Sequence, residues 1–161
     1  FFSPQRTMAA TKRLGKELNR MMVTPESPFV TVSHHTPDLF LWTVQLSFPE
    51  GSCYAGNVFE LQFRFNSDYP IESPEVIFTG SNLPCHEHIY TNGHICMDIL
   101  YDKWSPALTI SAVCLSIHSM LSSATPEVMK RPPDNDQYVA KCRATGQSPK
   151  QTRWWFHDDK A

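Results

Sequence analysis

The sequence is poor in several features that would place it in other classes of protein. It has no long apolar run, since the longest apolar-leaning stretch, 110–121, is short and broken by Ser and His. Charged residues make up only 19% of the chain, and the formal net charge is −2. A general nucleic-acid binder needs a clear excess of Lys and Arg. We therefore expect neither a nucleic acid nor a membrane as a partner.

Glycine is also scarce, at 6 residues, whereas proline is frequent, at 13. This balance indicates rigid loops rather than flexible linkers. The five cysteines are odd in number and widely spaced, in a chain large enough to bury a real core without disulfides. We expect free thiols and a reducing compartment, the cytoplasm or the nucleus.

The length of 161 residues fits one compact domain. We expect residues 1–7 to be a processing or cloning remnant, residues 8–146 to form a single core domain, and residues 147–161 to form an aromatic-rich C-terminal segment. That segment contains Trp154, Trp155 and Phe156. Few basic residues flank them, so we expect them to pack onto the fold or face a substrate rather than stack on nucleic-acid bases.

Hydrophobic periodicity predicts an α+β fold. Residues 9–22 place apolar side chains on one helical face. Alternating apolar and polar residues between short turns predict a four-stranded antiparallel meander. The expected strands are residues 29–33, 39–48, 58–65 and 75–78. Helical patterning returns at Ile110, with Thr109 as the expected N-cap, and a last helix is expected after Asp134, a further candidate cap.

The stretch from residue 80 to residue 108 follows neither period, and a structureless loop of this length in a compact domain is usually functional. It holds a cluster of thiol and imidazole side chains: Cys85, His86, His88, His94 and Cys96. One interpretation is a zinc site, because zinc binds both groups. The spacing does not favour it, since neither pair forms a tight knuckle and no second cysteine pair lies elsewhere.

The other interpretation is a nucleophilic cysteine. Asn92-Gly93 predicts a sharp turn before Cys96, and His88 and His94 are candidates either to lower the pKa of its thiol or to donate hydrogen bonds. The other cysteines fit apolar packing (Cys114 and Cys142) or loop positions (Cys53 and Cys85). Composition and spacing leave both chemistries open.

Several motifs in order resemble one family, the ubiquitin-conjugating enzymes. The segments that resemble its first helix, strand, Pro-rich loop and active-site region are Lys12–Leu18, Tyr54–Gly56, Tyr69–Val76, His86–Leu100 and Trp104–Thr109. This resemblance runs from Lys12 to Ser122. Arg131–Asn135 and Thr152–Asp159 further resemble the W-type branch of the family. The predicted order of helix, meander, loop and helices agrees with the family's fold.

The resemblance implies a mechanism. Cys96 accepts ubiquitin as a thioester from the ubiquitin-activating enzyme and passes it to a substrate amine. No cofactor and no metal is implied, because ATP is used by the activating enzyme upstream. The candidate catalytic residues around the nucleophile are His86, His88, Asn92 and Asp98. Residues 8–146 would then be the catalytic domain.

Two residues depart from the family's pattern. His88 stands where most members have Asn, and Glu87 replaces a Pro. Because an imidazole can donate a hydrogen bond, His88 either supports the oxyanion of the transfer step or braces the loop through its backbone. No acidic residue aligns with the one that the family places near the incoming lysine: Val128 falls near that position, and Asp134 and Asp136 lie further on. Asp98, two residues after Cys96, is the candidate carboxylate for orienting an amine.

A site with few residues to activate an incoming lysine favours another acceptor. An α-amino group has a pKa of about 7.7–8.0, against about 10.4 for lysine, which leaves about 10²-fold more neutral amine at pH 7. The W-type branch is associated with this specificity, so we expect transfer to the N-terminal α-amino groups of proteins. Lysine-directed transfer is the alternative. A different ubiquitin-like modifier, a non-catalytic ubiquitin-binding variant and a zinc-binding module follow it.

The same resemblance implies a surface that contacts the activating enzyme and RING-type or U-box ubiquitin ligases. Its residues are Lys12, Arg13, Lys16, Ile71, Ser105, Pro106 and Ala107. Small apolar side chains on a Pro-fixed loop suit a shallow, transient contact, and a basic helix suits electrostatic capture. The substrates are expected to be proteins with accessible N-termini.

Overall fold

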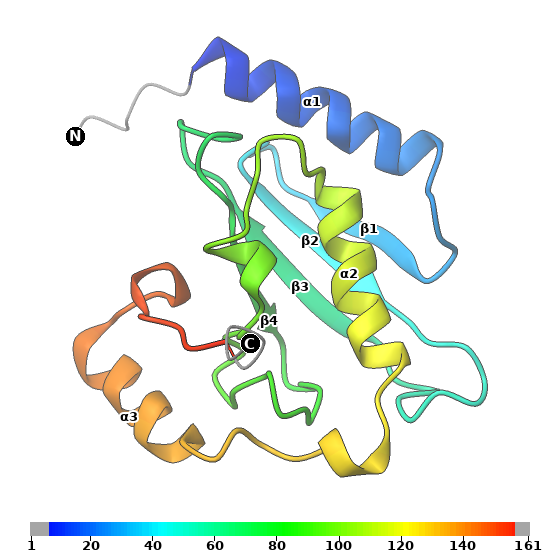
Figure 1. Cartoon of the computed structure of the whole chain (residues 1–161). Coiled ribbons are helices and arrows are strands. Elements are labelled where there is room, and N and C mark those ends of the chain that lie inside the picture. Colours follow the sequence, from blue (N-terminus) through cyan, green and yellow to red (C-terminus); the bar gives the residue numbers. More distant parts are fainter. Residues whose placement is uncertain (1–6, 157–161) are drawn as a thin grey trace.

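A computed structural model describes residues 7–156, so the prediction for the first six residues and for the motif beyond Phe156 lies outside the described residues. Figure 1 shows the order of a helix, a sheet and two further helices. The elements are α1 (Met8–Val23), β1 (Val30–His35), β2 (Leu41–Leu46), β3 (Phe59–Arg64), β4 (Glu75–Thr79), α2 (Ile110–Ser122) and α3 (Asn135–Thr145). Short 3₁₀ turns occur at Asp98–Leu100, Pro126–Val128 and Pro149–Gln151. The predicted α+β order is confirmed.

The predicted N-terminal helix is confirmed as α1, with one more residue at each end. The hydroxyl of Thr7 accepts a hydrogen bond from the amide of Ala10 at 3.1 Å and caps the first turn. Leu14 and Leu18 lie on its buried face, which packs against β1 and α2. The opposite face of α1 carries exposed basic side chains, including Lys12.

The four strands are antiparallel neighbours in chain order, β1-β2-β3-β4, as predicted. Their register places Val44 opposite Leu61 and Leu61 opposite Phe78, so one row of apolar side chains crosses the sheet. The strand ends differ from the prediction by at most two residues. Phe48 and Phe65 stay buried although they lie beyond the ends of their strands, and alternation alone therefore overestimates the ladder.

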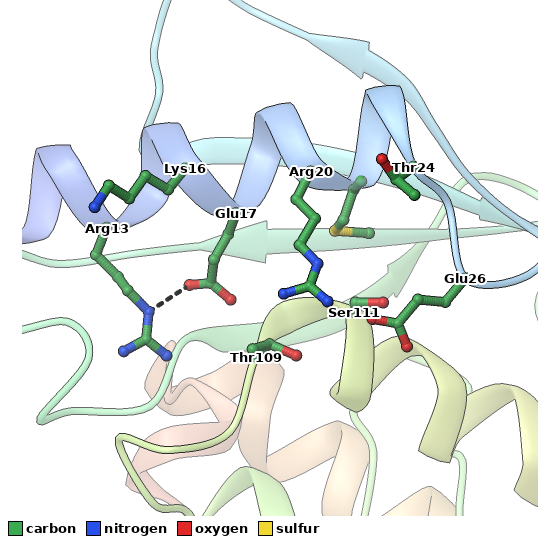
Figure 2. A pocket seen from close by; sticks show the side chains of 9 residues that line it. Arg13, Lys16, Glu17, Arg20, Thr24, Glu26, Thr109 and Ser111 are labelled. Carbon is green, nitrogen blue, oxygen red and sulfur yellow. Dashed lines mark hydrogen bonds and ion pairs between the residues drawn. The ribbon is translucent and has the colours of Figure 1, made fainter.

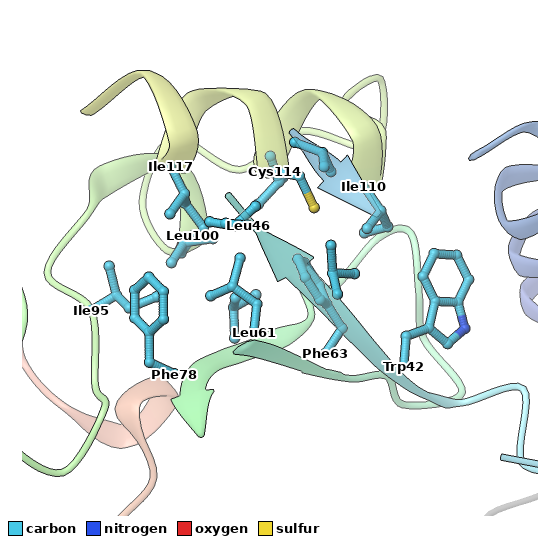
Figure 3. Close-up of a cluster of buried hydrophobic side chains, with 14 of the residues drawn as sticks. Trp42, Leu46, Leu61, Phe63, Phe78, Ile95, Leu100, Ile110, Cys114 and Ile117 are labelled. Carbon is cyan, nitrogen blue, oxygen red and sulfur yellow. The ribbon is translucent and has the colours of Figure 1, made fainter. Parts of the chain in front are cut away.

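The main core lies between one face of the sheet and α2 (Figure 3). Helix α2 begins where predicted, because the hydroxyl of Thr109 accepts a hydrogen bond from the amide of Ala112 at 3.1 Å. From this helix Ile110, Cys114 and Ile117 are fully buried. Burial of a large apolar side chain contributes about 1.5–3 kcal/mol. Cys114 is a core residue, as predicted.

The long loop predicted before α2 is confirmed, and it carries local structure of its own. It contains a 3₁₀ turn at Asp98–Leu100 and isolated β-bridges that join Ile77 to His94 and Ile89 to Ile95. Ile89 and Ile95 are fully buried, so the loop is docked on the core. Pairings of single residues leave no periodic pattern in a sequence, which is why periodicity did not indicate them.

Helix α3 begins after Asp134, but the predicted capping contact is wrong. The Asp134 side chain makes no cap hydrogen bond and instead accepts one from the hydroxyl of Tyr90 at 2.9 Å. Tyr90, Tyr138 and Cys142 form a second buried cluster, which joins α3 to the loop. The packing role predicted for Cys142 is confirmed.

Candidate active site

The turn before Cys96 is fixed by the sheet beneath it. Gly93 has a φ of 86°, and its carbonyl accepts a hydrogen bond from the amide of Phe78 at 2.9 Å. A Cβ at Gly93 would lie 2.0 Å from the Phe78 carbonyl oxygen, so a side chain does not fit. The Asn92 side chain accepts a hydrogen bond from the amide of His94 at 3.1 Å. The predicted turn is confirmed, and Asn92 shapes it.

Two histidines hold the main chain of Cys96 in place. The Cys96 amide donates a hydrogen bond to the His88 carbonyl at 2.8 Å, and the His88 amide donates one to Nδ1 of His86 at 3.0 Å. His86 is only 3% exposed, and burial lowers its pKa to about 4, with the neighbouring His88 adding to the effect. His86 is therefore a neutral acceptor that positions the loop. The imidazole of His88 is half-buried and lies 4.0 Å from the carboxylate of Glu87.

The expectation that neighbouring histidines lower the pKa of the Cys96 thiol is wrong. Burial first, and then the charges of Asp134 and Asp98, together raise that pKa to about 11. His94 cannot offset this effect, because burial lowers its own pKa to about 4 and keeps it neutral. Its Nδ1 lies 2.7 Å from the hydroxyl of Tyr138. At neutral pH Cys96 is thus held as a thiol.

Two cavities meet at Cys96. One, of about 660 Å³, lies toward α3 and is lined by Tyr90, Asp134 and Tyr138 among others. The other, of about 640 Å³, lies toward α2 and is lined by Met120 and Lys130 among others. Glu87, His88, Cys96 and Pro133 line both cavities. Cys96 therefore lies where the cavity toward α3 meets the cavity toward α2.

The two aspartates near Cys96 differ in their contacts. Asp98, the predicted one, forms an ion pair with Nζ of Lys103 at 3.0 Å. Asp134 is exposed, lines the cavity toward α3, and exerts the larger of the two charge effects on the Cys96 thiol. The sequence indicated Asp134 as a helix cap and as one of two acids beyond the position where the family has one, but favoured Asp98 as the carboxylate near Cys96.

The same motif supplies two further residues that were missed as parts of the site. The Arg131 guanidinium donates a hydrogen bond to the carbonyl of Pro84 at 2.9 Å. The side chain of Asn135 accepts a hydrogen bond from the amide of Thr91 at 2.9 Å and donates one to its hydroxyl at 3.1 Å. Both side chains tie the segment before α3 to the active-site loop. They keep the α3 side of the cavity next to Cys96.

The C-terminal aromatic residues divide between packing and exposure. Trp154 stacks on Tyr101 with ring centroids 5.2 Å apart, and Phe156 is buried beside the same tyrosine. Trp155, by contrast, is 74% exposed. Its carbonyl oxygen, however, lies 3.9 Å from Sγ of Cys96 and accepts a hydrogen bond from the thiol. No sequence pattern placed this main-chain group at the nucleophile.

Figure 2 shows the cavity of about 190 Å³ between α1 and the start of α2, lined by Arg13, Lys16, Glu17 and Arg20 among others. Arg13, which was predicted to face a partner, makes contacts within the fold itself. Its Nε pairs with Glu17 at 3.0 Å, and its Nη2 donates hydrogen bonds to the carbonyls of Pro106 and Leu108 at 2.9 and 3.0 Å. Arg13 therefore fixes the position of the Ser105–Ala107 loop relative to α1.

The remaining predicted partner residues lie near this junction. Lys12, Lys16, Ile71, Pro106 and Ala107 are exposed, and Ser105 is half-buried. Nε1 of Trp104 donates a hydrogen bond to the carbonyl of Pro70 at 2.9 Å, which joins the loop of Ile71 to the Ser105–Ala107 loop. The structure thus brings together the two loops and the helix of the predicted surface.

Two features of residues 7–156 bear on the alternatives. Within them, no group of three or more Cys, His, Asp or Glu side chains is arranged to hold a metal ion. No helix in the same range is long and apolar enough to cross a membrane. All five cysteines are free thiols.

Comparison with known proteins agrees with this geometry. The family model described as "Ubiquitin-conjugating enzyme" matches residues 13–154. A probable ubiquitin-conjugating enzyme E2 16 of Arabidopsis thaliana is 51% identical over 94% of this chain and 90% of its own. A probable ubiquitin-conjugating enzyme E2 W of Dictyostelium discoideum is 50% identical over 95% of this chain and 98% of its own. The crystal structure of UbcA1 from Agrocybe aegerita matches with a TM-score of 0.78 and 39% identity, over 86% of this chain and 96% of that one.

The chain belongs to the ubiquitin-conjugating enzyme family and is a transferase of the ubiquitin conjugation pathway. Its similarity to E2 W proteins of several organisms confirms the resemblance to the W-type branch. Enzymes of this family work with ubiquitin, with a ubiquitin-activating enzyme and with ubiquitin ligases.

Proposed function

We propose that Cys96 carries ubiquitin as a thioester and that the enzyme transfers it to the N-terminal α-amino groups of proteins. The observation that supports the first part is the position of Cys96, a half-buried thiol that lines both cavities. Cys114 and Cys142, by contrast, are buried as packing residues. No cofactor takes part in either step.

Charging is an exchange between two sulfurs. Sγ of Cys96 attacks the carbonyl carbon of ubiquitin's thioester with the activating enzyme, and the bond from that carbon to the activating enzyme's sulfur breaks. The proton leaves Cys96, and the departing thiolate takes up a proton. One thioester replaces another, so the exchange is close to thermoneutral. The raised pKa of Cys96 keeps the thiolate fraction small, so the groups around this thiol control how fast it reacts.

Transfer needs a neutral amine. The acceptor's ammonium group first loses a proton to solvent, and its nitrogen then attacks the thioester carbonyl carbon. The tetrahedral intermediate loses a second proton, the carbon–sulfur bond breaks, and the Cys96 thiolate is protonated. The net products are an amide, the thiol and one released proton. We assign the imidazole of His88, which lines both cavities, to hydrogen bonding with the oxyanion.

Asp134 is a better candidate than Asp98 for binding the incoming amine. The charge of Asp98 is compensated by Lys103 at 3.0 Å. Asp134 is held through one oxygen by the hydroxyl of Tyr90, faces the cavity toward α3 and has its second oxygen available to a cationic group. The amine therefore approaches Cys96 from the α3 side.

An α-amino acceptor fits this site because the site supplies little help with deprotonation. Neither Asp98 nor Asp134 is paired with a histidine among the described residues, and burial lowers the pKa values of both His86 and His94 to about 4. At pH 7 about one α-amino group in ten is already neutral, against about one lysine in a few thousand. Substrates with accessible N-termini, RING-type or U-box ligases as partners, and the cytoplasm and nucleus as location complete the proposal.

The test is a competition between two peptides that are alike except for their amino groups. One has a free N-terminus and no lysine, and the other is acetylated at its N-terminus and carries one internal lysine. The protein is charged with ubiquitin, charging is stopped, and both peptides are added at equal concentration. The proposal expects the first peptide to be modified at least tenfold faster, as read by intact mass. Equal rates, or faster modification of the lysine, would contradict it.

A further inference from the structure

Residues 147–156, here called the C-terminal strap, fold back from α3 across the active site (Figure 1). The strap begins with a 3₁₀ turn in which Ser148 and Gln151 form a capping box. One anchor is Lys150, whose Nζ donates a hydrogen bond to the carbonyl of Ser73 and lies 3.4 Å from the Glu72 carboxylate. This anchor lies beside the start of β4, away from Cys96.

The middle of the strap is held by an aromatic cluster. The ring of Trp154 packs between Tyr101 and Tyr138, with centroids at 5.2 and 5.4 Å, and its Nε1 donates a hydrogen bond to the Pro149 carbonyl at 2.8 Å. The hydroxyl of Thr152 lies 2.9 Å from that of Tyr138. These contacts fix the direction in which the next two residues run.

Trp155 and Phe156, the next two residues of the strap, cover the nucleophile. Trp155 lines the cavity toward α3 and Phe156 the cavity toward α2, so the main chain passes over Cys96 between them. The carbonyl oxygen of Trp155 accepts a hydrogen bond from the Cys96 thiol at 3.9 Å. That contact suits a thiol, which has a hydrogen to donate, and repels a thiolate, which has none. The closed strap therefore favours the unreactive form of the nucleophile.

We propose that the C-terminal strap is an autoinhibitory lid, which shields the Cys96 thiol when closed and lifts before the thiol reacts. The need to lift follows from geometry, because an incoming carbonyl carbon must reach the atom that the Trp155 carbonyl now faces. The weak point is the Lys150 anchor, which consists of one hydrogen bond and one partly exposed ion pair, contacts that each contribute little in water. The link to ubiquitin charging rests on the proposed function, whereas the shielding does not.

The experiment measures alkylation of each cysteine in the full chain by iodoacetamide, followed by peptide mass spectrometry. Cys53 is exposed and serves as the internal reference within the same molecule. Lys150→Met removes both anchor contacts, and Arg143→Met, an equal loss of charge at the exposed end of α3, is the matched control. Ubiquitin charging of Cys96 is followed in the same three proteins.

In the wild type we expect Cys96 to be alkylated at least tenfold more slowly than Cys53. Lys150→Met is expected to raise the Cys96 rate about three- to tenfold, with Cys53 unchanged, and Arg143→Met to alter neither. Equal rates for the two cysteines in the wild type, or no response to Lys150→Met, would overturn the lid. If Cys96 alkylation responds but no variant is charged with ubiquitin, the lid stands and the proposed function fails. If charging is normal but Cys96 alkylation does not respond to Lys150→Met, the proposed function stands and the lid fails.

Discussion

The Cα of Gly93 faces the main chain of Phe78 so closely that a Cβ there would lie 2.0 Å from the Phe78 carbonyl oxygen. The contact presses the turn before Cys96 against β4, and the amide of Phe78 bonds to the Gly93 carbonyl at 2.9 Å. Cys96 lies three residues after Gly93, so its position is set by the contact of this turn with the sheet. A rigid base of this kind is what a precisely placed reacting atom requires.

Replacing Gly93 by Ala tests this docking. The change adds a clash with main-chain atoms to the strain of a side chain at a φ of 86°, so we expect a loss of at least about 2–3 kcal/mol in unfolding free energy and slower ubiquitin charging. Gly56→Ala is the matched control, because Gly56 has a φ of 83° and open space around it. It should cost about 1 kcal/mol. Similar urea midpoints for both variants would show that the contact with Phe78 is unimportant.

Arg13 and Lys12 are neighbours on α1 with different predicted effects. Arg13→Ala removes three contacts, including the cation paired with the buried Glu17, and should cost about 2 kcal/mol of unfolding free energy. Lys12→Glu changes an exposed side chain and should leave stability within about 0.5 kcal/mol while slowing charging by the activating enzyme. Urea unfolding and charging rates read the two effects. Unchanged charging in Lys12→Glu would remove this lysine from the partner surface.

Asp134→Asn is expected to affect the two steps in opposite directions. Discharge to a peptide α-amine should slow about tenfold, because the amine loses a carboxylate partner. Charging should be at least as fast as in the wild type, because the Asp134 charge raises the pKa of Cys96. The measurement is a single-turnover discharge of the purified thioester, alongside initial charging rates.

Two variants complete that experiment. Asp136→Asn removes an equal charge from the first turn of α3 and should slow discharge little, since Asp136 is bonded to Asn135 and does not line the cavity. Discharge to hydroxylamine, a nucleophile that is neutral at physiological pH, should be insensitive to Asp134→Asn. A slow discharge in Asp98→Asn together with a normal one in Asp134→Asn would return the role to Asp98.

The pH dependence of Cys96 reactivity follows from its raised pKa. Because burial and the charges of Asp134 and Asp98 disfavour the thiolate, its fraction should rise about tenfold per pH unit until about pH 11. Alkylation of Cys96 in the folded protein should therefore still be increasing at pH 10. In urea-unfolded protein the same cysteine should level off near its ordinary pKa of 9.0. A plateau near pH 9 in the folded protein would show that burial does not raise the pKa of Cys96.

What the sequence predicted is mostly local. The helix α1, the four strands and the Thr109 cap follow from periodicity and capping, which depend on neighbouring residues, and their ends were within two residues. The motif around Cys96 also identified the family correctly. These features need no knowledge of how distant segments meet.

What the sequence did not show depends on distant contacts. The direction of the Cys96 pKa shift is set by burial and by the charge of Asp134, which lies 38 positions further along the chain. Likewise, Asp134 reads as a helix cap until the structure brings Tyr90 to it. Side chains that meet only through the fold leave no spacing pattern to read.

The most direct test of the account is the chemical nature of the bond between ubiquitin and this chain. The protein is incubated with ubiquitin, activating enzyme and ATP, and intact mass is recorded before and after treatment with a thiol reductant. We expect one added ubiquitin that the reductant removes, no such adduct with Cys96→Ala, and a reductant-resistant ester with Cys96→Ser. A thiol-labile adduct that persists in Cys96→Ala, or no adduct in the wild type, would contradict the assignment of Cys96 as the ubiquitin carrier.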